Sequence, residues 1–471
     1  MGDSKPRQRK FAPRSRQGCL TCRARRKRCD GQRPECANCT RLNVKCQWQS
    51  QRQIVAGPEQ SKSPSPAPAE QITEICPLRS SLDPWDAFSG DEAAEQRHLL
   101  SYYIEAFVPS ISIATTQSSY YTRLYIPMAL QSKGVFDAIM ALASAQLARR
   151  TVNGDRAQHL RTLSAKHQGK CHSFIKQRVL PSGELVSDEY QVIGIILLLI
   201  GLEALNGAKN TKWIAQTECV RKMLNTLYAK PDYIGSWELD AVQRHFTYHD
   251  AMATVMMGVS KTSPSSLVPR NMPQLLGPPP SLTVDPLMGL SYYLCSLVCR
   301  IQYVTAASPA FPFTSEAAFL AIEQEIQQWQ YDSPMSLPDV DLPVALDLIA
   351  LAESYRLAAL IHLYRKSDTH KSLVPGCASR AMHFIDRIPP GSPADSSLLY
   401  PIFLAGAELD NETDITKCST RLTAIQARNR YENVGNVQKI LQEVWRPVLT
   451  GERKRNWEDV LKEWGWSISL S

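Results

Sequence analysis

The fold of the N-terminal region is decided by residues 19–46, which read CLTCRARRKRCDGQRPECANCTRLNVKC. The cysteine spacing is C-x2-C-x6-C, then six residues, then C-x2-C-x6-C, so one motif is written twice. A C-x2-C pair lets two thiolates reach one metal from a tight turn, and six further residues allow a helical excursion before the third ligand. The spacing therefore predicts a metal-bound module whose ligands are Cys19, Cys22, Cys29, Cys36, Cys39 and Cys46.

The number of ligands suggests how many metals are bound. Two tetrahedral zinc ions need eight ligand positions, and the motif supplies six thiolates. The deficit closes if two sulfurs each bridge both metals. Because the two halves of the motif are equivalent, the bridging sulfurs are expected at matching positions, and we assign them to Cys19 and Cys36.

The loop inside the first half of the motif is strongly basic. Its charged residues are Arg23, Arg25, Arg26, Lys27 and Arg28. Six thiolates and two zinc dications sum to a net charge of −2, which these side chains would offset while lowering the thiol pKa values. About 30 residues cannot build a sufficient core, so metal binding is expected to supply the folding energy.

An iron–sulfur centre, a zinc ribbon and incidental thiols are the alternatives to a two-zinc cluster. Iron–sulfur centres usually take four cysteines, and a polybasic interior is unusual for them. A zinc ribbon would leave two cysteines unused. Incidental thiols do not account for so regular a spacing. The two-zinc cluster uses all six cysteines.

The charge of the chain is concentrated at its N-terminus. Residues 1–50 contain 14 Lys/Arg and three Asp/Glu, whereas the remaining 421 residues carry a net charge of −3. The arm before the cysteines is basic as well. This distribution predicts a polyanionic partner for the first tenth of the chain, with the arm contributing to phosphate contact and nuclear import.

The N-terminal segment resembles the fungal zinc binuclear cluster family of transcription factors. The resemblance covers all six cysteines, the basic loop, Asp30 and Pro34. It implies double-stranded DNA as the partner and a helix in the major groove over a CGG-like triplet, with Arg25 and Arg26 at the base-reading positions and Arg23 and Arg28 among the phosphate contacts. Position 26 is most often Lys in the family, but arginine also pairs with guanine O6 and N7.

The rest of the chain has the sequence pattern of a helical domain. Apolar residues recur at intervals of three and four, as one helix face requires, in three sets: Leu99 to Phe107, Val135 to Leu147, and Tyr355 to Tyr364. The strongest apolar run, Val192 to Leu202, is too short for a bilayer and predicts a buried helix. With no secretory signal and 13 cysteines, a reducing compartment and no membrane partner are expected.

The expected organisation is a small two-zinc module joined by a disordered linker to a large all-α domain. The predicted parts are a basic arm (1–17), the zinc cluster (18–48), a Pro/Ser/Gln-rich flexible linker (49–84) and a helical body (85–471) with a proline-rich loop at 262–286 that divides it into halves. The linker has no heptad pattern, so dimerisation is expected through the body.

The body resembles the fungal-specific regulatory domain of the second type, found in sterol-uptake and acriflavine-sensitivity regulators. The resemblance rests on Tyr248-His-Asp250, Asp285-Pro-Leu-Met-Gly289, Pro401-Ile-Phe-Leu-Ala-Gly406 and the Trp-rich end. It implies a helical regulatory body that in some members senses a small apolar ligand.

Two smaller patterns in the body have alternative interpretations. His245 and His249, four apart and followed by Asp250, are either metal ligands on one helix face or ordinary helix residues. Cys295 and Cys299 are either buried free thiols or a redox pair.

The functional prediction is a nuclear, non-enzymatic regulator of RNA polymerase II transcription that activates a dedicated metabolic or secondary-metabolite gene set through the transcription machinery. The alternatives are a sterol- or drug-responsive regulator, and an enzyme or ligand carrier with an accessory zinc module.

Overall fold

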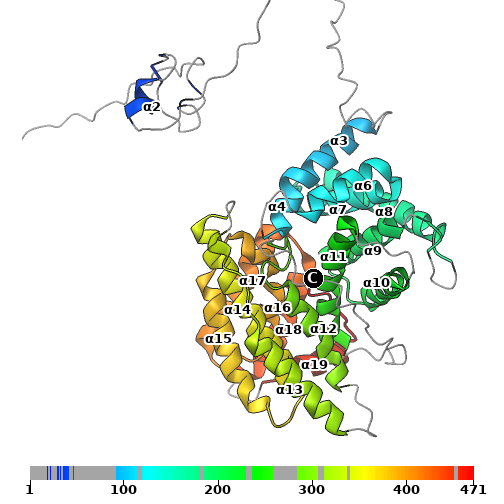
Figure 1. The fold of residues 1–471 in the computed structure, drawn as a ribbon. Coiled ribbons are helices and arrows are strands. Elements are labelled where there is room, and N and C mark those ends of the chain that lie inside the picture. Colours follow the sequence, from blue (N-terminus) through cyan, green and yellow to red (C-terminus); the bar gives the residue numbers. More distant parts are fainter. Residues whose placement is uncertain are drawn as a thin grey trace, which may run out of the picture. The chain divides into compact units, whose positions relative to one another are not determined.

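The chain separates into two units, residues 1–78 and 79–471, each with its own internal contacts (Figure 1). In this computed structural model, the described residues of the first unit are 19, 22, 29–30, 32, 36–41 and 46. Those of the second unit are 92–113, 119–180, 185–187, 189–229, 236–257, 284–305, 312–336, 340–449 and 454–471. The predicted basic arm and linker, and most of the predicted proline-rich loop, lie outside the described residues.

The second unit is built from helices. They are α3 (Ala93–Tyr102), α4 (Val108–Ile111), α5 (Tyr120–Arg123), α6 (Tyr125–Gln131), α7 (Lys133–Arg150), α8 (Gly154–Lys176), α9 (Glu189–Leu205), α10 (Lys212–Tyr228), α11 (Trp237–Met257), α12 (Tyr292–Thr305), α13 (Pro312–Gln328), α14 (Leu342–Tyr364), α15 (Val374–Arg387), α16 (Leu399–Gly406), α17 (Glu412–Asn429), α18 (Glu432–Leu449) and α19 (Trp457–Trp464). Among the described residues there is no β-strand, only two isolated bridges. The predicted all-α body is therefore confirmed.

The predicted apolar faces are buried. α7 packs along α8 and α9, and α14 packs along α15 and α16. α9 carries the run Val192 to Leu202, and its apolar side chains are buried. None of the described helices combines the length and hydrophobicity needed to cross a bilayer.

The two halves of the body share one hydrophobic core. α11 packs against α9 in the first half and α12 in the second, and α18 returns to contact α9. A single cluster of buried residues runs from Leu99 to Leu470. Figure 1 shows the C-terminal residue close to α11 and α16, in the middle of the body. The proline-rich loop therefore separates two groups of helices along the sequence, but both groups contribute to the same hydrophobic core.

One segment departs from the regular helix that its apolar spacing predicts. Residues Tyr103–Phe107 form a π-helical turn between α3 and α4, and the Val108 N–H donates to the Tyr103 carbonyl five residues back. Pro109 follows directly, and a proline inside a helix has no N–H to donate and its ring clashes with the carbonyl four residues before it. The wider turn accommodates the proline while Tyr103 and Phe107 remain buried.

Candidate metal centre and DNA-binding module

Four cysteine sulfurs of the first unit lie together. The Sγ atoms of Cys19, Cys22, Cys36 and Cys39 all lie within 4.8 Å of one another, and the four side chains are buried. Cys29 and Cys46 are half-buried and pack against this group. The structure thus brings together all six cysteines of the predicted ligand set.

The sulfur separations fit tetrahedral zinc. Cys19 Sγ lies 3.7 Å from Cys36 Sγ and 3.8 Å from Cys39 Sγ. Cys22 Sγ lies 3.6 Å from Cys36 Sγ and 3.9 Å from Cys39 Sγ. A tetrahedron with Zn–S bonds of about 2.3 Å has S···S edges of about 3.8 Å. Because no disulfide links these cysteines, all their sulfurs are available as ligands.

The two halves of the motif have matching local geometry. The Cys19 N–H donates to Cys29 Sγ at 3.4 Å, and the Cys36 N–H donates to Cys46 Sγ at the same distance. In each half the first cysteine therefore turns the backbone toward the third. This correspondence is what a duplicated sequence motif requires.

The first cysteine of each half has the environment that most favours a thiolate. Burial acts to raise the pKa of the Cys19 thiol, but the Cys22 N–H and neighbouring thiols outweigh it, so the pKa is lowered. The pKa of Cys36 is lowered in the same way, through the N–H of Cys39. Burial instead raises the pKa of Cys22, to about 12, and also that of Cys39. Cys19 and Cys36 are thus the two sulfurs best stabilised as anions.

A short helix and an aspartate connect the two halves. α2 (Ala37–Arg41) begins directly after Cys36 and carries Cys39 on its first turn. The Ala37 N–H donates to Asp30 Oδ2 at 3.1 Å, so the residue after Cys29 holds the start of the second half. Asp30 was part of the sequence resemblance, but its partner was not evident from the spacing.

The predicted DNA-contacting residues (Arg23, Arg25, Arg26, Lys27 and Arg28) lie outside the described residues, as does Pro34. Their neighbours Cys22 and Cys29 are described. The basic loop is thus attached at both ends to cysteines of the candidate metal centre.

The histidine pair of the body is buried. His249 Nε2 lies 3.1 Å from His245 Nε2, and Asp250 pairs with Arg221. Within the described part of the chain, the groups able to hold a metal are Cys19/Cys22/Cys36/Cys39 and Cys29/Asp30/Cys36. Of the two interpretations, this environment favours ordinary helix residues over metal ligands for His245 and His249.

Cys295 and Cys299 are buried on α12 and neither forms a disulfide. The Cys299 Sγ–H donates to the Thr247 carbonyl at 3.9 Å. Burial raises the pKa of Cys295 well above its usual range, which suppresses thiolate chemistry. The interpretation as buried thiols is the one that this environment supports.

Comparisons with known proteins agree with both units. Residues 17–54 match the Fungal Zn(2)-Cys(6) binuclear cluster domain, and residues 98–471 match the Fungal specific transcription factor domain. The chain is 21% identical to the Transcriptional activator protein UGA3 of Saccharomyces cerevisiae, covering 97% of this chain and 98% of that protein.

Two further relatives match over short stretches of the chain. The chain is 63% identical over 35 residues to the Zinc cluster transcription factor CZF1 of Candida albicans (7% of this chain, 9% of that protein). It is 55% identical over 38 residues to the Sterol uptake control protein 2 of the same organism (8% and 5%). No solved structure matches the chain. With the sulfur geometry and both domain matches in place, the chain belongs to the fungal zinc cluster transcription factors.

Proposed function

We propose that this protein is a nuclear, sequence-specific regulator of RNA polymerase II transcription that holds two zinc ions and binds CGG-type triplets. Arg25 and Arg26 contact guanine edges in the major groove, while Arg23 and Arg28 contact phosphates and Lys27 adds to the same surface. The observation that carries the proposal is that the sulfurs of Cys19 and Cys36 lie at tetrahedral-edge distances from each other, Cys19 also from Cys39 and Cys36 also from Cys22. Such a group suits a metal, and in the sequence the basic loop lies between two of the cysteines, Cys22 and Cys29.

The two-zinc count rests on sulfur sharing. Cys19 and Cys36 occupy equivalent places in the duplicated motif, and each lies close to sulfurs of both halves. One zinc held by Cys19, Cys22, Cys29 and Cys36, and another held by Cys19, Cys36, Cys39 and Cys46, use all six thiolates. The lowered pKa values of Cys19 and Cys36 suit sulfurs that bind two cations at once.

The charge distribution supports a DNA partner over other partners. The first 50 residues carry a net charge of +11, whereas the rest of the chain is slightly acidic. Each phosphate that a basic side chain neutralises releases counterions, so the affinity should fall steeply with salt. Activation of transcription is proposed by analogy with the Transcriptional activator protein UGA3 of Saccharomyces cerevisiae, which matches nearly the whole chain, and a dedicated metabolic gene set is the proposed target.

The proposal is tested by fluorescence anisotropy of the zinc-loaded full chain with a duplex carrying a CGG triplet and with a scrambled duplex. Arg26→Ala is expected to cost about 1–3 kcal/mol on the CGG duplex and little on the scrambled one, because a bidentate contact to one guanine is lost. Arg28→Ala is the matched control, since a lost phosphate contact weakens both duplexes equally. Equal weakening of both duplexes by Arg26→Ala would contradict the base-reading role.

Dimerisation through the body is part of the proposal. A single triplet is too short to select a promoter, so a second DNA-binding module is needed for specificity. Sedimentation of the full chain is expected to show a dimer at micromolar concentration, and removal of residues 1–78 should leave it dimeric. If the chain without residues 1–78 is monomeric, the body does not hold the dimer contacts. If the full chain is monomeric as well, the protein does not dimerise at this concentration.

A further inference from the structure

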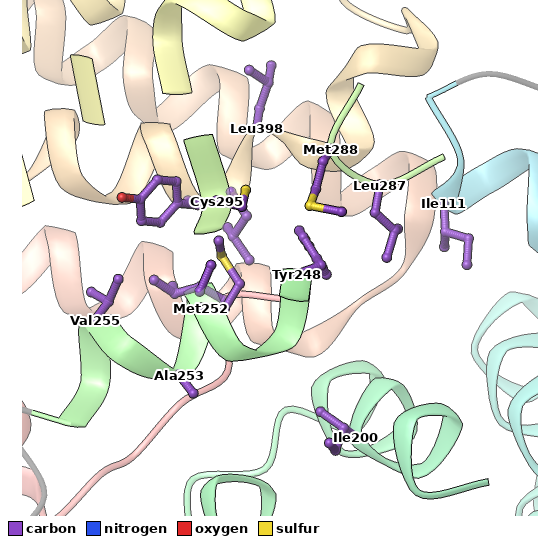
Figure 2. Packing of buried hydrophobic residues seen from close by; sticks show 14 of the residues in the cluster. Ile111, Ile200, Tyr248, Met252, Ala253, Val255, Leu287, Met288, Cys295 and Leu398 are labelled. Carbon is purple, nitrogen blue, oxygen red and sulfur yellow. The ribbon is translucent and has the colours of Figure 1, made fainter. Parts of the chain in front are cut away.

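A small cavity of about 50 Å³ lies inside the body where several distant segments meet. Its walls come from α11, α16, α17, the start of α18 and the last two residues of the chain. Figure 2 shows Leu287 between Tyr248 of α11 and Ile111 at the end of α4, and all three side chains line the cavity. The lining is mostly apolar, with a few polar side chains among it.

Three lining residues bring buried polar atoms that have no hydrogen-bond partner within the described part of the chain. They are His249 Nδ1, Asn429 Oδ1 and Asn433 Oδ1. The relative exposures of these residues are 3%, 6% and 2%. A buried polar group left without a partner costs free energy, so three around one space mark it as a place for ordered water or for a small polar ligand that replaces the water.

The hydrogen on His249 is set by a chain of contacts. Tyr125 Oη lies 2.6 Å from His245 Nδ1, its sole hydrogen-bond partner among the described residues. Because the buried phenol donates there, His245 carries its hydrogen on Nε2, which faces His249 Nε2 at 3.1 Å and Tyr121 Oη at 3.4 Å, so His249 Nε2 is the side of that ring without a hydrogen. Burial lowers the pKa of both histidines, that of His249 to about 3, so both are neutral. His249 therefore carries its remaining hydrogen on Nδ1, as a donor.

The orientation of the Asn433 amide is set in the same manner. Asn433 Nδ2 donates to the carbonyls of Ser469 at 3.1 Å and Ser471 at 2.8 Å. Both hydrogens of the amide nitrogen are thus used, which leaves Oδ1 as an acceptor. The cavity offers one N–H donor and amide oxygens as acceptors.

We propose that this cavity binds a compact, neutral ligand that carries both a carbonyl oxygen and an N–H group, such as a primary carboxamide or a lactam. The carbonyl accepts from His249 Nδ1–H, and the N–H donates to Asn433 or Asn429. Neither Lys nor Arg is among the lining residues, so an anionic ligand such as a carboxylate would be buried without a counter-ion.

The size of the cavity limits the ligand. At about 10–15 Å³ for each water position, the space accommodates roughly three to five non-hydrogen atoms. Sites for drug-sized ligands are about 300–1,000 Å³, far larger than this one. The cavity thus argues against a sterol at this position. It is independent of the zinc cluster, so the proposal stands or falls apart from DNA binding.

The test is a titration of the zinc-loaded full chain with acetamide and with the four-membered lactam 2-azetidinone, followed by saturation-transfer NMR. Acetone, which accepts but has no N–H, and acetate, which is charged, are the matched probes. Acetamide is expected to bind with millimolar affinity, as its size allows, and at least about tenfold more tightly than acetone, whereas acetate should not bind. His249→Phe should weaken acetamide binding by about tenfold or more.

His362→Phe is the control variant, because His362 is equally buried with an unpartnered Nε2 within the described residues but lies outside the cavity. It should bind acetamide like the parent protein. If His249→Phe does not fold, Val434→Leu, which fills part of the space, replaces it and should also abolish binding. The proposal is overturned if acetamide does not bind at about 100 mM, if acetone binds equally well, or if the cavity variant binds like the control.

Discussion

The two units of this protein hold their folds by different forces. In the zinc cluster, the buried group among the described residues consists of cysteine sulfurs alone. The body instead has a continuous core that includes Trp213, Trp445, Tyr355 and Phe403, each almost fully buried. We propose that six metal ligands fix the zinc module, which has too few apolar side chains to fold, whereas the body depends on hydrophobic burial. Stability in the two units should therefore respond to different perturbations.

Removal of zinc should produce the largest difference between the units. A chelator is expected to abolish binding to the CGG duplex, because metal binding provides about 10–16 kcal/mol of apparent free energy in small zinc modules. The far-UV circular dichroism of the body and its urea midpoint should hardly change. Loss of the helical signal together with zinc would show that the two units do not depend on different forces.

A cavity in the core of the body should have the opposite effect. Leu197→Ala, at a fully buried position of α9, is expected to lower the free energy of unfolding by about 2–5 kcal/mol while zinc content stays constant. Leu346→Ala, at a position that is 51% exposed, should change it by less than about 0.5 kcal/mol. Urea unfolding measures both. Equal effects would place Leu197 outside the cooperative core.

Acid should destabilise the body through its buried histidines. Burial, and then Lys366 and Arg365, lower the pKa of His362 to about 3. In the unfolded chain a histidine has a pKa of about 6.5, so below this pH His362 is protonated in the unfolded chain but stays neutral in the folded body. Stability is therefore fully present above about pH 6.5 and falls as the pH drops toward 3, by about 2 kcal/mol at pH 5 for this residue.

His362→Leu should reduce this dependence. Between pH 7 and pH 5 the variant is expected to lose about 2 kcal/mol less than the parent protein in urea unfolding. His159→Gln is the control, because the His159 side chain is 53% exposed. If both variants keep the parent slope, His362 is protonated in the folded body.

Two glycines with positive φ offer the finest comparison. Gly207 has φ +64° and an added Cβ there would lie 2.6 Å from Glu432 Cβ, whereas Gly465 has φ +65° with no atom within 4 Å. Gly465→Ala should cost about 1 kcal/mol for the left-handed backbone alone. Gly207→Ala should cost more, because α18 must also shift. Thermal unfolding of the two variants gives the difference, and equal costs would mean that Glu432 moves freely.

The sequence was informative where function depends on neighbours along the chain. The cysteine spacing predicted which cysteines the structure brings together, and the intervals of three and four predicted α7 and α14, since both patterns are local. The histidine chain was not predicted, because Tyr125 and His245 are 120 residues apart and meet only through tertiary packing. The cavity was missed for the same reason. The spacing of apolar residues predicts a regular helix through Phe107, whereas Pro109 disturbs the helical hydrogen bonds just before it. The spacing alone therefore does not predict the π-turn.

Native mass spectrometry of the purified full chain tests the central claim most directly. If paired metals organise the N-terminal module, the mass should exceed that of the polypeptide by two zinc ions, and both should be lost together when Cys19 is replaced by alanine. A chain that carries one zinc or none, or one that keeps two zinc ions in Cys19→Ala, would contradict the account.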